Sequence, residues 1–188
     1  AAASVRLAEN NETCMFATVL CGRLDVASGR IRLASAGHEP PLLLHADGRS
    51  ELLDVAGGVP LGFEPSDVFP LYEGVLPAGS TLVGYTDGVT EAFDPDNHAY
   101  GSERLLRALA PGDSAEAACQ RLLDDVRRFA GEAPQSDDIT ILAISRTRDL
   151  DTDTSQAHAR LAKGETSVHT CVAQSSEDVL RMTDAIDA

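Results

Sequence analysis

Two acidic sites stand at the ends of strand-like segments, and their oxygen atoms are the chain's clearest candidates for chemistry. Asp87 directly follows a run of strand-forming residues, whereas Asp137 and Asp138 directly precede another. Carboxylates at strand ends suit a hard divalent cation, because strands hold the oxygens in place and Gly88 lets the backbone turn and a ligand approach closely. If the two strands are antiparallel neighbours, both sites meet at one end of a sheet.

Two other interpretations of these carboxylates remain open at this point. Paired carboxylates also perform acid and base catalysis in glycoside hydrolysis, although no other feature of the chain indicates a sugar cleft. Alternatively, Asp87 completes an ordinary Asp-Gly turn and Asp137 caps another, with no ligand at either. Residue types and spacing alone support the turn and the metal site about equally.

Composition narrows the class of protein. The 188 residues include 30 acidic and 15 basic side chains, for a formal net charge of −15. This charge repels nucleic acid and anionic lipid. No apolar run approaches the roughly 18 residues of a membrane helix, and the N-terminal residues lack the pattern of a secretory signal. We therefore expect a cytoplasmic protein that binds neither nucleic acid nor membrane.

The four cysteines do not indicate a metal site or a disulfide framework. Cys14, Cys21, Cys119 and Cys171 form no CxxC pair and have no histidine at zinc-like spacing. We expect free and mostly buried thiols, as is usual in a reducing cytoplasm.

The elements that must position the acidic residues follow from hydrophobic periodicity. Strand-like runs with turn residues between them predict a meander of antiparallel strands. These runs are Met15–Leu24, Arg30–Ala36, Leu42–His45, Ser50–Leu53, Val68–Glu73 and Thr81–Tyr85. The glycine-rich segment Gly57–Gly62 is interpreted as a structural loop, because Phe63 and Glu64 stand where a P-loop needs lysine and serine or threonine.

Helical patterns follow the strands. Apolar residues at spacings of three and four predict helices at Ser102–Ala110 and Ser114–Ala130, before an apolar strand at Ile141–Ser145. This order favours an α+β domain over residues 1–146. Residues 147–165 read as a linker, and 166–188 hold a strand and a helix that either dock on this domain or begin a second one.

Six motifs occur in one order between about Cys14 and Ser145. They are MFATVL from Met15, ASAGHEPPLLL from Ala34, VPLG from Val59, LVGYTDGVTEAFD from Leu82, YGSERL from Tyr100 and QSDDITILAI from Gln135. Together they resemble the metal-dependent, type-2C-like (PPM) serine/threonine protein phosphatases, in the bacterial branch named after stage II sporulation protein E.

The resemblance implies an antiparallel β-sandwich with flanking helices and a centre of two Mn²⁺ or Mg²⁺ ions. It further implies that a water molecule attacks the phosphorus of a phosphoserine or phosphothreonine in line. Asp87 and Asp137 match the family's later two acidic ligands, expected on the same ion. Asp138 and Gly88 lie beside them, and His38 of the AGHEPP motif is expected to brace its loop rather than to react.

The family's earlier motifs are a Gly-Gly-Asp-type segment and an Asp-Val-x-Gly-type strand, and no residues before Cys14 resemble either. We therefore expect a sandwich incomplete at its N-terminus and only part of the two-metal site. The implied substrate is a phosphorylated anti-anti-sigma-type regulator. The rival hypothesis is a catalytically incomplete phosphatase fold that acts in protein–protein interaction.

The C-terminal residues carry a second, shorter resemblance. Ser167–Ala188 is similar to the opening strand and helix of the histidine-kinase-like ATPase domains of anti-sigma factors, yet it holds no ATP-binding motif. Fusion to sensor and kinase-like domains, or dimerisation, is the assembly that this family implies.

Overall fold

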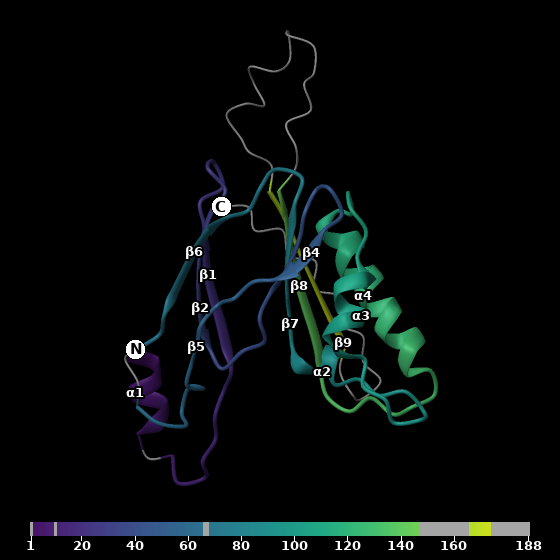
Figure 1. Cartoon of the computed structure of the whole chain (residues 1–188). Coiled ribbons are helices and arrows are strands. Elements are labelled where there is room, and N and C mark those ends of the chain that lie inside the picture. Colours follow the sequence, from purple (N-terminus) through teal and green to yellow (C-terminus); the bar gives the residue numbers. More distant parts are fainter. Residues whose placement is uncertain (1, 10, 66–67, 147–165, 174–188) are drawn as a thin grey trace. The chain divides into compact units, whose positions relative to one another are not determined.

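A computed structural model describes residues 2–9, 11–65, 68–146 and 166–173 (Figure 1). Contacts divide the chain into two compact units. The first unit comprises Ala1–Pro40 and Leu53–Leu76, and the second comprises Pro41–Leu52 and Pro77–Ala188. The linker predicted at 147–165 and the helix predicted within 176–188 lie outside the described residues, so both stay predictions.

In its described part, the first unit contains one helix and a sheet built around a central strand. Its elements are α1 (Ala2–Ala8), β1 (Val19–Leu24), β2 (Arg30–Ala36), β5 (Gly57–Gly58) and β6 (Leu71–Val75). Strand β2 pairs antiparallel with β1 and β6 and parallel with β5. Ile31 and Leu33 are buried while Arg30 and Arg32 are exposed, which is the period-two pattern of a sheet with one solvated face.

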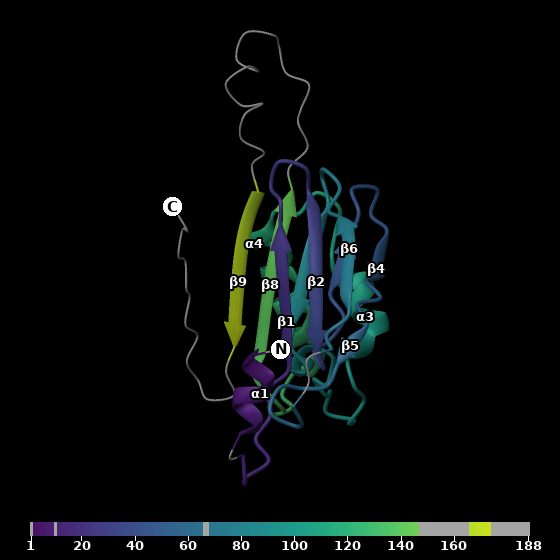
Figure 2. The same cartoon turned by 90° about the vertical axis from the view of Figure 1, so that its left-hand side faces the viewer.

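The second unit contains a five-stranded antiparallel sheet in the order β4-β3-β7-β8-β9. Figure 2 shows β8 and β9 side by side. The strands are β3 (Leu42–Leu44), β4 (Ser50–Leu52), β7 (Thr81–Tyr85), β8 (Ile139–Arg146) and β9 (Thr166–Ala173). Leu42, Val83 and Ile141 are fully buried on these neighbouring strands. Strands β7 and β8 thus lie inside the sheet, where packing holds their ends in place.

The described residues of the second unit form three helices: α2 (Asp87–Thr90), α3 (Gly101–Ala108) and α4 (Ala115–Ala130). Figure 1 shows α3 and α4 together on one face of the five-stranded sheet. Ala118, Leu122 and Val126 form the buried stripe of α4, and Ser114 caps its start by accepting a hydrogen bond from the amide of Ala117. In the described residues, no helix is long and apolar enough to cross a bilayer.

The expected α+β class, with antiparallel sheets and helices, is confirmed, whereas the packing of the two sheets into a sandwich stays a prediction. The strand expected from Val68 begins instead at Leu71, as β6. The expected start was wrong because Pro70 has no amide hydrogen to donate to a neighbouring strand. The segment Gly57–Gly62 is not wholly a loop, since its first two residues pair with β2.

The expectation of mostly buried thiols is wrong for two of the three cysteines whose side chains the structure describes. Cys14 and Cys21 are exposed, and only Cys119 is buried. Cys21 sits on the solvated face of β1, in register with Ala34 of β2, whereas Cys119 lies in the buried stripe of α4. The alternation of side chains along β1 did not by itself tell which face of the strand would be buried.

Candidate metal centre

The pairing of β7 with β8 brings the two acidic sites of the sequence to the same end of one sheet. Tyr85 lies opposite Ile141 in the antiparallel register, and the amide of Thr86 donates to the carbonyl of Thr140 at 3.1 Å. The next residues along the two strands in this direction lead to Asp87 and to Asp138. Residues about fifty positions apart in the chain therefore become neighbours.

Gly88 shows how closely the two segments approach. A Cβ atom at this buried position would lie 2.6 Å from the carbonyl oxygen of Asp138 and 3.2 Å from that of Asp137. Both contacts are with backbone atoms, which cannot swing aside as a flexible side chain can. A residue without a side chain is required here.

The carboxylates of Asp87 and Asp137 are both exposed. Oδ1 of Asp87 accepts the amide hydrogen of Gly88 at 3.0 Å, and Oδ1 of Asp137 accepts that of Asp138 at 2.6 Å. Within the described part of the chain, neither Oδ2 has a hydrogen-bond partner. Each carboxylate is thus held by one oxygen and keeps the other available.

This donor set fits a hard divalent cation. Mg²⁺ and similar ions prefer oxygen ligands and commonly bind through one or two carboxylates while keeping several waters. Asp87 and Asp137 offer two carboxylates that are open to solvent. Each of these carboxylates can therefore offer an oxygen ligand to such an ion.

One of the two side chains just before Asp137 ties its segment to the chain that follows α2, and the other bonds within the segment. The hydroxyl of Ser136 donates to the carbonyl of Glu91 at 2.8 Å, and Nε2 of Gln135 donates to the carbonyl of Asp137 at 2.8 Å. Sequence reasoning did not single out these two residues. They lie in the QSDDIT motif, which is the signal that could have drawn attention to them.

His38 lies in the first unit, in the turn after β2. Its Nδ1 is 3.2 Å from the hydroxyl of Thr18, and its backbone amide donates to the hydroxyl of Ser35 at 3.1 Å. The same Ser35 hydroxyl lies 3.2 Å from the carbonyl of His38. These contacts join the turn to β2 and to the residues before β1, which supports a bracing role for His38.

A second acidic group was missed by sequence reasoning. Ligand atoms of Asp94, Asp96 and His98 all lie within 4.8 Å of one another. Their Asp-x-Asp-x-His spacing in the sequence is the signal that could have identified them. The backbone amide of His98 donates to Asp94 and lowers the pKa of that carboxyl. The hydrogen bonds of this exposed loop therefore account for the grouping without an ion.

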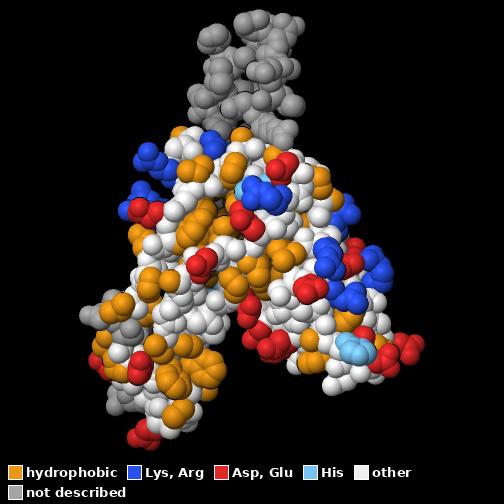
Figure 3. Space-filling view, viewed as in Figure 1, with side chains coloured by type: hydrophobic (Ala, Val, Ile, Leu, Met, Phe, Trp, Pro, Cys, Tyr) orange, Lys and Arg blue, Asp and Glu red, His pale blue; other side chains and the backbone are white. Residues whose placement is uncertain are grey.

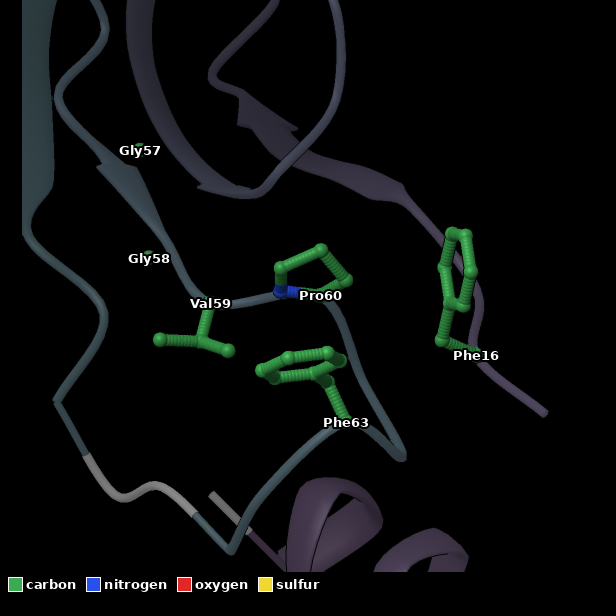
Figure 4. A pocket seen from close by; sticks show the side chains of 6 residues that line it. All are labelled: Phe16, Gly57, Gly58, Val59, Pro60 and Phe63. Carbon is green, nitrogen blue, oxygen red and sulfur yellow. The ribbon is translucent and has the colours of Figure 1, made fainter. Parts of the chain in front are cut away.

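A pocket of the first unit is unsuited to acid–base or metal chemistry. It has a volume of about 510 Å³ and is lined by Phe16, Gly57, Gly58, Val59, Pro60 and Phe63 (Figure 4). No titratable side chain contributes to this lining.

In the space-filling view, hydrophobic side chains gather over the part of the first unit where α1 lies (Figure 3). Phe16 and Phe63 are 62% and 70% exposed.

The fold is that of PPM-type (PP2C) phosphatase domains. The structure of the PP2C phosphatase domain and a fragment of the regulatory domain of the cell fate determinant SpoIIE from Bacillus subtilis matches with a TM-score of 0.62 at 20% identity. This match covers 74% of the present chain and 41% of that one. The RsbU and RsbW domains of Rv1364c from Mycobacterium tuberculosis match with a TM-score of 0.56 at 30% identity, over 69% and 37% of the two chains.

Sequence comparison assigns the branch. Residues 1–147 match the model of the Stage II sporulation protein E (SpoIIE) family, and the chain belongs to this family. Protein IcfG of Synechocystis sp. is 32% identical over 142 residues, which cover 73% of this chain. The chain spans 22% of the length of that relative.

Proposed function

We propose that the chain acts in the metal-dependent hydrolysis of phosphoserine or phosphothreonine on a regulatory protein, with Asp87 and Asp137 as ligands of one Mn²⁺ or Mg²⁺ ion. The observation that carries the proposal is the antiparallel register of β7 and β8, which sets both carboxylates at one sheet end. Membership of a phosphatase family supports the same chemistry. Two ions are expected in a complete domain of this kind.

Each residue of the site has a separate task in this proposal. A bound divalent cation supplies positive charge that stabilises the transferred phosphoryl group and lowers the pKa of a water molecule. Asp87 and Asp137 hold the cation and balance its charge. Gly88 permits their close approach, and Asp138 lies beside them. No protein nucleophile is needed, because water attacks the phosphorus directly while the P–O bond to the serine or threonine oxygen breaks and that oxygen leaves as the hydroxyl group.

The proposed substrate is a phosphorylated anti-anti-sigma-type regulator. Two observations support it: the SpoIIE family match, and the similarity of Ser167–Ala188 to the start of an anti-sigma-type ATPase domain. In addition, one solved relative contains both an RsbU and an RsbW domain. By the same analogy, this chain works beside sensor or kinase-like domains, or as a dimer, in the cytoplasm.

The test is Mn²⁺-dependent release of phosphate from a phosphoserine peptide and from p-nitrophenyl phosphate. Asp87→Asn and Asp137→Asn should each abolish the Mn²⁺-dependent activity, because each removes a charged ligand. Asp124→Asn, on the exposed face of α4, is the matched control and should leave it unchanged. Wild-type turnover in both site variants would refute the proposed metal ligands.

A second candidate function is a catalytically incomplete phosphatase fold that binds a partner protein. The exposed apolar side chains of Met15, Phe16 and Phe63 favour it, since large exposed apolar patches mark interaction sites. Calorimetric titration with Mn²⁺ separates the two functions. Tight Mn²⁺ binding that Asp87→Asn and Asp137→Asn abolish argues for the enzyme, whereas weak binding, or binding that these variants leave unchanged, argues for the interaction module.

A further inference from the structure

We infer that Thr86 is a positioning residue whose hydroxyl group aligns Asp87 with Asp137 and Asp138. This inference rests on the proposed function, because the alignment matters only if these carboxylates hold a cation. Thr86 has no carboxylate to offer a cation, but it directly precedes Asp87, the first proposed ligand.

The hydroxyl of Thr86 bridges the ends of β7 and β8. It donates to the carbonyl of Asp138 at 2.9 Å and accepts the amide hydrogen of Thr140 at 2.9 Å. The backbone amide of Thr86 adds a third bond, to the carbonyl of Thr140 at 3.1 Å. The single hydroxyl hydrogen and one lone pair are thereby both committed to β8 and the residue before it.

The side chain is needed because the backbone carbonyl of Thr86 is engaged elsewhere. In a regular ladder the amide of Thr140 would bond to that carbonyl. Here the carbonyl accepts instead from the amide of Val89, at 3.0 Å, in the first turn of α2. The hydroxyl takes the vacated place in the ladder, so the chain changes from strand to helix without leaving the Thr140 amide unpaired.

The position of Thr86 at the start of α2 also shows that its hydroxyl bonds to β8 rather than to the helix. Thr86 is the N-cap residue of this helix, with extended backbone angles, yet its side chain makes no cap hydrogen bond. Threonine hydroxyls at N-caps ordinarily accept from the second or third helical amide. This hydroxyl contacts the other strand instead, so its bonds serve the junction between strands rather than the helix start.

The bridge acts on the same atom that limits position 88. The carbonyl oxygen of Asp138 receives the Thr86 hydroxyl and also lies where a Cβ of Gly88 would stand. Residues on both sides of Asp87 therefore contact Asp138. Loss of the hydroxyl bond should let the Asp137–Asp138 segment move away from Asp87 and so misplace the ligands.

Mn²⁺ binding to the full chain, followed by paramagnetic broadening of the amide NMR signals, tests the inference. Thr86→Val removes the hydroxyl at nearly constant shape, and Thr86→Ser keeps it. We expect Thr86→Val to weaken Mn²⁺ affinity at least about tenfold and Thr86→Ser to restore it. Thr81→Val is the matched control, because it removes a hydroxyl from the opposite end of β7 and should leave affinity unchanged.

Hydrogen exchange of the Thr140 amide supplies a readout without metal. It should accelerate in Thr86→Val and stay slow in Thr86→Ser and Thr81→Val. Wild-type Mn²⁺ affinity in Thr86→Val would overturn the positioning role while leaving the proposed metal site intact. Absence of broadening at Gly88 in the wild-type chain, or broadening that Asp87→Asn leaves unchanged, would overturn the metal site and the inference with it.

Discussion

Replacement of Gly88 by alanine should separate Asp87 from the Asp137–Asp138 segment. The new Cβ would lie 2.6 Å from the carbonyl oxygen of Asp138, where ordinary van der Waals contact begins near 3.4 Å. One of the two segments must therefore move by about 0.8 Å. Because Gly88 is buried in α2 and meets backbone atoms, the movement falls on the backbone that carries the ligands.

Gly88→Ala should affect both the stability of the fold and the affinity for the ion. Overpacking of this kind costs about 1–3 kcal/mol. Alanine in place of glycine within a helix returns about 1 kcal/mol. We therefore expect the free energy of unfolding to fall by about 0–2 kcal/mol. Displaced ligands commonly lower metal affinity about 10–100-fold.

Thermal unfolding and Mn²⁺ titration of the same samples measure these two quantities. Gly57→Ala is the matched control, since a Cβ at Gly57 meets nothing within 4 Å. It should change neither the unfolding temperature nor the Mn²⁺ affinity appreciably. If Gly88→Ala bound Mn²⁺ as the wild-type chain does, the close approach at position 88 would be irrelevant to the site.

Three further predictions concern the packing of the second unit. Leu122→Ala empties a fully buried position in α4 and should lower the free energy of unfolding by about 2–5 kcal/mol in denaturant titrations, where a loss below about 1 kcal/mol would contradict the assigned core. Tyr100→Phe removes the hydroxyl that donates to Asp125 at 2.7 Å and should cost about 1–3 kcal/mol by the same measurement, whereas an unchanged midpoint would show that this bond adds nothing. Arg121 donates to Asp113 at 2.7 and 3.0 Å and lowers the pKa of that carboxyl. The pair therefore stabilises the fold fully above the pKa of about 4 that the carboxyl has in the unfolded chain. This contribution is lost as the pH falls through the pKa of the folded protein. Asp113→Asn should thus lower the unfolding temperature more at pH 7 than at pH 2, and an equal loss at both values would contradict the ion pair.

Much of the second unit could be predicted from local pattern. The three- and four-residue spacing of apolar residues located α4, and the run before Asp87 located β7 with the bounds that the structure shows. The short elements escaped because a single turn, such as α2, leaves no periodic signal. The two-residue strand β5 escaped for the same reason, and its pairing with β2 is a long-range contact.

The candidate site divides in the same way. Asp87 and Asp137 could be selected by their chemistry and by the motifs around them. The roles of Thr86 and Ser136 could not, because each depends on a partner 45 to 52 positions away in the chain. Hydroxyl side chains are common near turns, and local sequence does not tell which carbonyl they will reach.

The sequence by itself determined the residue types at both strand ends, the apolar runs that become β7 and β8, and the family to which the chain belongs. Tertiary structure alone decided that these ends meet, that position 88 has no room for a side chain, and that the Thr86 hydroxyl replaces a backbone carbonyl in the ladder. The physical reason is register: hydrophobic periodicity tells which face of a strand is buried, whereas the alignment of one strand with another is set by packing over the whole sheet.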